Sequence, residues 1–103
     1  MDANGYPEQA ELDTIKAWPL PDWQGLMKYV GERWHWPDHW RTRLESHQQV
    51  HAVSTGGWSG NEGLIRALEA NVMFWAICWF SSQRGGHYVF KIPLQSSEPA
   101  EQR

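Results

Sequence analysis

Residues 54–92 read STGGWSGNEGLIRALEANVMFWAICWFSSQRGGHYVFKI, and the interpretation of the apolar run within them decides the fold. After a glycine-rich start, apolar residues recur at steps of four, four, three and four, namely at Leu64, Leu68, Val72, Trp75 and Trp79. This spacing is typical of one face of a helix. We therefore predict one helix over residues 60–83, or two helices with a break near Asn71, with Arg84-Gly85-Gly86 as the C-terminal cap.

A competing interpretation makes residues 74–80 a strand, which forms a hairpin with residues 87–92 through the turn SSQRGG. We favour the helix, because the apolar stripe stays in phase throughout. In both cases residues 72–80 (VMFWAICWF), the longest apolar run of the chain, are predicted to lie in the core. In both cases, too, the last strand ends at Pro93.

Upstream of this stretch, residues 22–35 carry the pattern of another amphipathic helix. Asp22 is a favourable N-cap residue, and the apolar positions that follow share one helical face. These positions are Trp23, Leu26, Met27, Val30 and Trp34. Residues 49–55 alternate as a strand does, whereas residues 38–48 show no clear pattern. We predict an α+β fold with two or three helices packed on one face of a small, mainly antiparallel sheet.

The two ends of the chain are polar and show no apolar periodicity. We therefore predict a flexible N-terminal arm over residues 1–14 and a flexible C-terminal tail over residues 95–103. Residues 15–94 are predicted to form a single globular domain, because a chain of 103 residues suits one modest core.

Composition and charge argue against several functional classes. The net charge of −3 lacks the basic excess that binds phosphate backbones, so nucleic acid is a disfavoured partner. The longest apolar run is far shorter than the roughly 18–20 residues of a membrane-spanning helix, and the N-terminus does not resemble a secretory signal. Cys78 is the only cysteine, which excludes an intrachain disulfide and favours the cytoplasm. We predict no cofactor.

The glycine-rich segment differs in its pattern from phosphate-binding loops. Gly57, Gly60 and Gly63 are spaced as G-x-x-G-x-x-G, and no lysine follows them. Ser59 and Glu62 fit a helix capping box instead, and the Glu62 carboxylate would repel an anion. The first glycines are better explained as a turn that leaves the preceding strand with positive φ. The five histidines show no zinc-binding spacing, so we predict no metal site and no catalytic residue.

Tryptophan is the outlier of the composition, with eight residues in a chain of 103. So many indoles are hard to bury in a small core, and exposed Trp is a preferred interface anchor. The alternative is that they pack half-exposed around the core. We select Trp58, Trp36 and Trp40 as candidate anchors. Trp58 stands in a turn, where small polar residues are usual, so it must pack elsewhere in the protein or on a partner.

A polar cluster is predicted where the turns at residues 56–63 and 84–87 meet, provided that the strands carrying them are neighbours. Its members are Ser59, Asn61, Glu62, Arg84 and His87. They would form either a hydrogen-bond network that ties two loops together or a binding site, and we favour the network.

The segments STGGWSGNEGLIRAL and FWAICWFSSQRGGHYVFKI, which follow a Trp-rich amphipathic helix, resemble a family of small uncharacterised bacterial and phage-borne proteins. The similar part covers residues 20–92, and its motifs are TGGWSGNE and RGGHY. This resemblance implies a cytoplasmic accessory protein of bacterial or mobile-element origin. It implies no activity and no site residues.

The functional hypothesis is a non-enzymatic protein-interaction module that uses exposed Trp side chains as anchors. It would serve as an accessory or inhibitor protein of a phage or mobile element. Its partner would be another protein, with a homodimer as one arrangement. The alternative is a small-ligand, anion-binding or enzymatic site between the GGWSGNE and RGGH loops.

Overall fold

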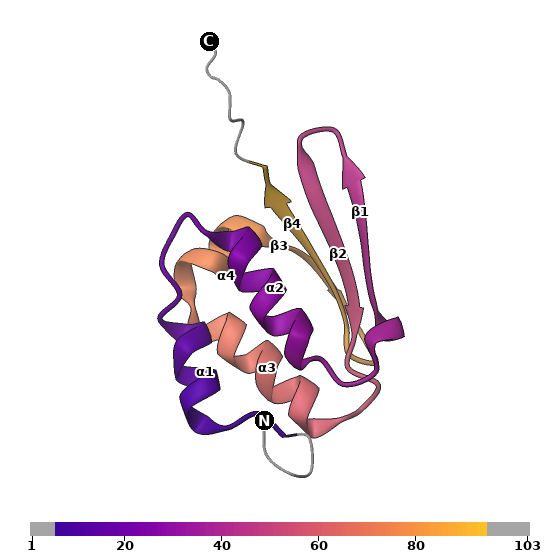
Figure 1. Ribbon diagram of the computed structural model, residues 1–103. Coiled ribbons are helices and arrows are strands. Elements are labelled where there is room, and N and C mark those ends of the chain that lie inside the picture. Colours follow the sequence, from indigo (N-terminus) through magenta and orange to yellow (C-terminus); the bar gives the residue numbers. More distant parts are fainter. Residues whose placement is uncertain (1–5, 95–103) are drawn as a thin grey trace.

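The computed structural model describes residues 6–94, which form four α-helices, one 3-10 turn and four strands (Figure 1). The elements are α1 (Gln9–Lys16), α2 (Trp23–Arg33), η1 (Pro37–His39), β1 (Trp40–Glu45), β2 (Gln48–Ser54), α3 (Ser59–Ala70), α4 (Val72–Cys78), β3 (Trp79–Gln83) and β4 (His87–Pro93). The predicted tail over residues 95–103 and the first five residues of the predicted arm lie outside the described residues.

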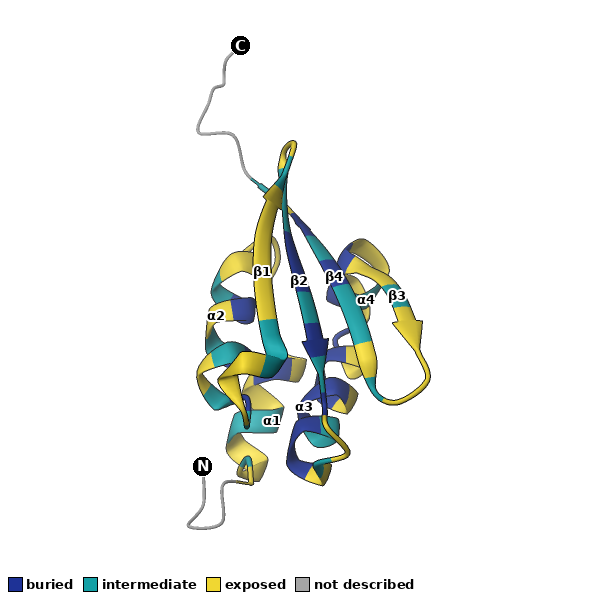
Figure 2. Ribbon diagram, turned by 90° about the vertical axis from the view of Figure 1, so that its right-hand side faces the viewer, coloured by how far each residue is buried: buried dark blue, intermediate teal, exposed yellow. Residues whose placement is uncertain are grey.

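The four strands form one antiparallel sheet in the order β1-β2-β4-β3. The helices cover one face of this sheet, and the other face carries no helix (Figures 1 and 2). The α+β prediction is therefore confirmed. In this order β1 and β3 are the two edge strands, and β2 and β4, which carry the two glycine-containing loops, are neighbours.

Helix α2 matches its predicted start and face. The Asp22 side chain caps its N-terminus by accepting a 3.2 Å hydrogen bond from the backbone N–H of Gly25. All five apolar positions of the predicted stripe are buried. Burial of this kind contributes about 1.5–3 kcal/mol for each large side chain and stabilises a helix that two glycines weaken.

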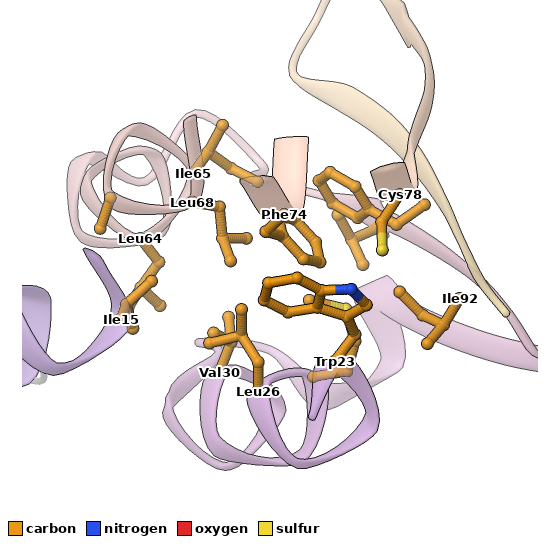
Figure 3. Packing of buried hydrophobic residues seen from close by; sticks show 14 of the residues in the cluster. Ile15, Trp23, Leu26, Val30, Leu64, Ile65, Leu68, Phe74, Cys78 and Ile92 are labelled. Atoms are coloured by element: carbon orange, nitrogen blue, oxygen red, sulfur yellow. The ribbon is translucent and has the colours of Figure 1, made fainter. Parts of the chain in front are cut away.

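The core lies between the helices and the covered face of the sheet (Figure 3). The Trp23 ring meets the Phe74 ring edge to face, with 5.7 Å between the centroids. Phe74 in turn packs against Phe90 of β4 at 5.4 Å. Leu64 and Leu68 of α3 belong to the same core cluster and are fully buried. These contacts join α2, α3, α4 and β4 into one cluster.

The predicted break near Asn71 is confirmed, but the helical assignment of residues 79–83 is wrong. Asn71 lies between α3 and α4, and its side chain accepts a hydrogen bond from Phe74 N at 3.2 Å as the cap of α4. Helix α4 ends at Cys78, and Trp79 begins strand β3. The Gly85 and Gly86 backbones, with φ of 90° and 80°, turn a hairpin from β3 to β4 and do not cap a helix. The competing interpretation is thus confirmed for the hairpin onto β4, but its first strand is Trp79–Gln83 and not residues 74–80.

The prediction that residues 72–80 lie wholly in the core is also wrong. Only Phe74 and Cys78 of this run are buried. A helix of seven residues at the side of the domain can turn just one narrow face toward the core. Trp75 is half-buried and packs against Phe90 at the edge of the core, with 5.6 Å between the ring centroids, whereas Val72, Met73, Ile77, Trp79 and Phe80 are exposed.

The flexible-arm prediction fails from Gln9 onward, because residues 9–14 belong to helix α1. Glu11 accepts a 2.8 Å hydrogen bond from the backbone N–H of Glu8, and its carboxylate forms a 2.7 Å ion pair with Arg33 of α2. Ile15 is fully buried in the core. The helix has few apolar residues of its own and depends on these tertiary contacts, which local sequence patterns do not show.

Strand β1 fills the region for which the sequence showed no pattern. It pairs antiparallel with β2 through the two-residue turn Ser46–His47, in which Ser46 adopts φ of 52°. Arg41 and Arg43 are exposed along its length. As an edge strand, β1 needs little apolar alternation, so its signal in the sequence is weak.

Candidate functional site

The glycine-rich loop between β2 and α3 is shaped by the packing of two tryptophans. Gly56 and Gly57 adopt φ of 63° and 75°, as the turn prediction requires. A Cβ on Gly56 would lie 2.5 Å from Trp36 Cζ3, and a Cβ on Gly60 would lie 2.6 Å from Trp58 Nε1. Gly56 and Gly60 therefore make room for indole rings, whereas a Cβ on Gly57 or Gly63 would meet nothing within 4 Å.

Trp58 is half-buried and stacked within the protein. Its ring lies between the rings of Tyr6 and His35, with centroid distances of 4.7 Å and 4.8 Å. The Trp58 Nε1 atom is buried and has no hydrogen-bond partner among the described residues. Trp58 is also the N-cap residue of α3, so the predicted capping box is wrong: Ser59 is the first residue of the helix, and its hydroxyl donates to Tyr6 Oη at 3.2 Å.

The other two candidate anchors differ in exposure. Trp40 is half-buried, and its Nε1 donates to His51 Nδ1 at 3.0 Å. Trp36 is 39% exposed and adopts φ of 63°, with its ring at the surface beside His39. Of the three, only Trp36 presents a large part of its ring to solvent.

Asn61 is almost completely buried and acts as a bridge between two loops. Its Oδ1 accepts from His35 N at 2.8 Å, and its Nδ2 donates to His35 O at 3.0 Å and to Thr55 O at 3.3 Å. These bonds hold the end of α2 against the loop after β2. All of its side-chain hydrogen bonds are to backbone groups, as expected for a structural residue.

The two predicted loops do meet, because β2 and β4 are paired. Thr55 N donates to Gly86 O at 3.0 Å, and His87 Nδ1 lies 2.7 Å from Ser54 Oγ. Among the described residues, however, no hydrogen bond or ion pair links the turn at residues 59–62 to Arg84 or His87. The five residues predicted as a polar cluster therefore do not form one network: Ser59 bonds to Tyr6, Asn61 to backbone groups and His87 to Ser54.

A cleft of about 590 Å³ opens where these loops meet the end of β1. Its polar lining comprises Asp38, His39, Arg41, Ser54, Gln83 and His87. We call it the two-loop cleft. Of the predicted site residues only His87 lines it. The residues from η1 and β1 were missed because no element was predicted there.

A second surface feature lies on α4 and β3, at the margin of the sheet that Figure 2 shows beside β4. Five large apolar side chains are exposed along 72–80, which we call the α4–β3 surface: Val72, Met73, Ile77, Trp79 and Phe80. Residues 71–83 contain no charged side chain. A concentration of exposed apolar side chains in a segment without charged residues is a typical mark of an interaction site. The Lys91 ammonium of β4 lies 3.9 Å from the centroid of the Phe80 ring.

The two most perturbed titratable groups are both held in their neutral forms by burial. Burial lowers the pKa of His51 to about 4. Its Nδ1 accepts from Trp40, so its Nε2 carries the proton and donates to Gln49 Oε1 at 3.1 Å. Burial likewise raises the pKa of the Cys78 thiol to about 12, which makes the thiol a poor nucleophile at neutral pH.

Comparison with known protein families, curated protein sequences and solved structures finds no match to this chain. Within residues 6–94, no three His, Cys, Asp or Glu side chains gather closely enough to hold a metal ion. None of the helices described for this chain has the length and apolar character needed to cross a membrane.

Proposed function

We propose that this protein is a non-enzymatic protein-interaction module and that it binds through the α4–β3 surface. The observation that carries the proposal is the exposure of five neighbouring large apolar side chains on a chain of 103 residues. Leaving such side chains in water costs free energy that burial against a partner recovers. A cytoplasmic setting fits the single cysteine, and an accessory or inhibitor role in a phage or mobile element stays a prediction.

The contrast between the two edge strands supports this location. Edge strand β1 carries Arg41, Arg43 and Glu45, and charges of this kind protect an edge from unwanted association. Edge strand β3 reads WFSSQ and carries no charge. Both of its aromatic residues are exposed. The Trp79 ring stacks on Trp75 of α4 at 6.0 Å, and the Phe80 ring lies 3.9 Å from Lys91 Nζ of β4. Only one edge of the sheet therefore has the chemistry of a contact surface.

The test is an affinity capture in which wild type and two variants of the full chain serve as bait in parallel. Met73→Glu/Ile77→Glu places two charges on the α4–β3 surface. Leu44→Glu is the matched control, because Leu44 is an exposed apolar residue on the opposite edge. We expect binding of any partner, including the protein itself, to be lost only in the double variant. Equal binding by all three proteins would refute the proposal.

The two-loop cleft supports a second candidate function, the binding of a small anionic ligand. Arg41, His39 and His87 bring cationic or hydrogen-bonding groups to its wall, and His39 Nδ1 is buried without a partner among the described residues. Titration with phosphate and with acetate, followed by NMR, should shift the His87 and Arg41 signals in wild type, and the His87 signals should not shift in Arg41→Ala. Absence of any shift in wild type would refute this candidate.

A further inference from the structure

We infer that the occupant of the α4–β3 surface is a second copy of this chain, so that the protein is a two-fold symmetric homodimer. This inference rests on the proposed function, since it names the partner of the same surface. Three features of the surface carry it: its area, its lack of charge and its place at a sheet edge.

The apolar area is sufficient for a specific dimer. Large side chains present on the order of 150–250 Å² each when fully exposed. The exposed fractions range from 42% for Trp79 to 71% for Val72, which leaves on the order of 500 Å² of apolar area on one protomer. Two copies would bury about 1,000 Å² of apolar surface together, which reaches the lower limit of specific interfaces before any polar rim is added.

The absence of charge suits a surface that must face itself. In a two-fold interface every residue of one copy meets the same patch of the other, so a charged side chain near the axis would be opposed by its own equivalent. Residues 71–83 contain no such side chain. The polar members, among them Ser82 and Gln83, are neutral hydrogen-bonding groups. Two copies can therefore meet through residues 71–83 without opposing like charges from this segment. The charge next to the surface is Lys91 of β4, whose Nζ lies 3.9 Å from the centroid of the Phe80 ring and is paired with Glu45 at 3.1 Å.

The position of β3 gives the contact a natural geometry. It is the outermost strand of the sheet, next to β4 only. Two identical edge strands related by a two-fold axis perpendicular to them run antiparallel, which is the direction in which neighbouring strands of this sheet already pair. Trp79 and Phe80 sit at the start of this strand, directly after α4. The helix and the start of the strand thus lie at the same margin of the sheet, where the Trp79 ring stacks on Trp75 of α4 at 6.0 Å.

The experiment measures the mass of the full chain in solution by light scattering after gel filtration, at about 10 μM and about 500 μM, which bracket the micromolar Kd of a small interface. We expect wild type to reach about 24 kDa, twice the 12.0 kDa of one chain. Met73→Glu/Ile77→Glu should raise the dimer Kd at least about 100-fold, because a buried unpaired charge would enter the contact from each copy. Leu44→Glu should keep the wild-type mass.

Several outcomes would overturn the inference. If wild type keeps the mass of one chain at the higher concentration, a second copy is not its partner. If the double variant still forms a dimer, the dimer uses another surface. If the charged double variant loses its circular dichroism signal, the neutral Met73→Gln/Ile77→Gln variant replaces it, and a dimer retained there overturns the inference equally. A monomer that still captures a foreign protein through the α4–β3 surface would refute the homodimer but not the proposed function. A monomer with no surface-dependent capture would refute both.

Discussion

Replacing Asn61 by Ala tests whether this residue holds the domain together or serves a binding site. The substitution removes three hydrogen bonds of 2.8–3.3 Å and leaves one backbone N–H and one carbonyl of His35, and the carbonyl of Thr55, without that partner. An unsatisfied buried group costs about 1–3 kcal/mol, and less where a carbonyl keeps access to water. We therefore expect the free energy of unfolding to fall by about 2–4 kcal/mol. That is a large share of the roughly 5–15 kcal/mol typical of small domains.

The assay is urea unfolding followed by tryptophan fluorescence, with the free energy taken by linear extrapolation. For a domain of this size a loss of about 3 kcal/mol lowers the urea midpoint by about 2 M, with the slope unchanged. Glu62→Ala is the matched control, because Glu62 is the next residue in the same helix turn and makes no side-chain hydrogen bond among the described residues. We expect the control to change stability by less than about 0.5 kcal/mol. An Asn61→Ala variant as stable as the control would refute the structural role and reopen the binding interpretation.

Three further predictions follow from buried groups and close contacts. Because the pKa of His51 is lowered to about 4, the unfolded state binds a proton at a higher pH than the folded state does. The contribution of His51 to the free energy of unfolding is therefore complete above about pH 6.5 and is lost as the pH falls toward 4. Up to roughly 3 kcal/mol should disappear over that window, and urea titrations at several pH values should show a shallower loss in His51→Gln; equal slopes would contradict the assignment. Gly60→Ala should cost about 1–3 kcal/mol, because the new Cβ meets the Trp58 ring, whereas Gly63→Ala, with open space around it, should be neutral or stabilising. Thermal unfolding of the two variants side by side checks this, and an equally mild Gly60→Ala would show that the indole moves aside freely. Cys78 should react with a thiol reagent only as fast as the protein opens, because the side chain is buried and burial raises its pKa to about 12. Rapid modification of the native protein would show that the thiol is accessible.

Elements whose stabilising contacts are local were predictable from the sequence. Helix α2 has its cap residue and its apolar face within the segment, and β2 and β4 show their alternation directly. Helix α1 and strand β1 depend on partners elsewhere in the chain. The first is held by the ion pair between Glu11 and Arg33, and the second by pairing with β2. Neither partner can be inferred from the residues of the element itself.

The run at residues 72–80 shows why periodicity misleads at an element boundary. Trp75 and Trp79 continue the helical spacing, yet their rings stack at 6.0 Å across the junction of α4 and β3. Side chains four residues apart can touch in this way whether or not the helix continues. The features that decide the structure are a cap and a turn: Asn71 caps the end of α3, and Gly85 and Gly86, with positive φ, close a hairpin that requires a strand before it. Apolar spacing alone does not distinguish these cases.

The candidate site lies on the α4–β3 surface and not at the glycine-rich loop, because glycines in that loop make room for tryptophan rings. In the sequence, a loop that combines a tryptophan with polar residues resembles a recognition patch, and this pattern favours Trp58 and its neighbours as binding residues. In the structure, Gly56 and Gly60 leave space into which the rings of Trp36 and Trp58 pack. The Trp58 ring of the loop therefore packs within the protein, against Tyr6, His35 and Trp36. On α4 and β3 the residues that follow in sequence have no glycine to make such space, and their side chains remain exposed. Surface that the domain does not bury for itself is the surface that a partner can bury, which is the physical reason to place the contact there.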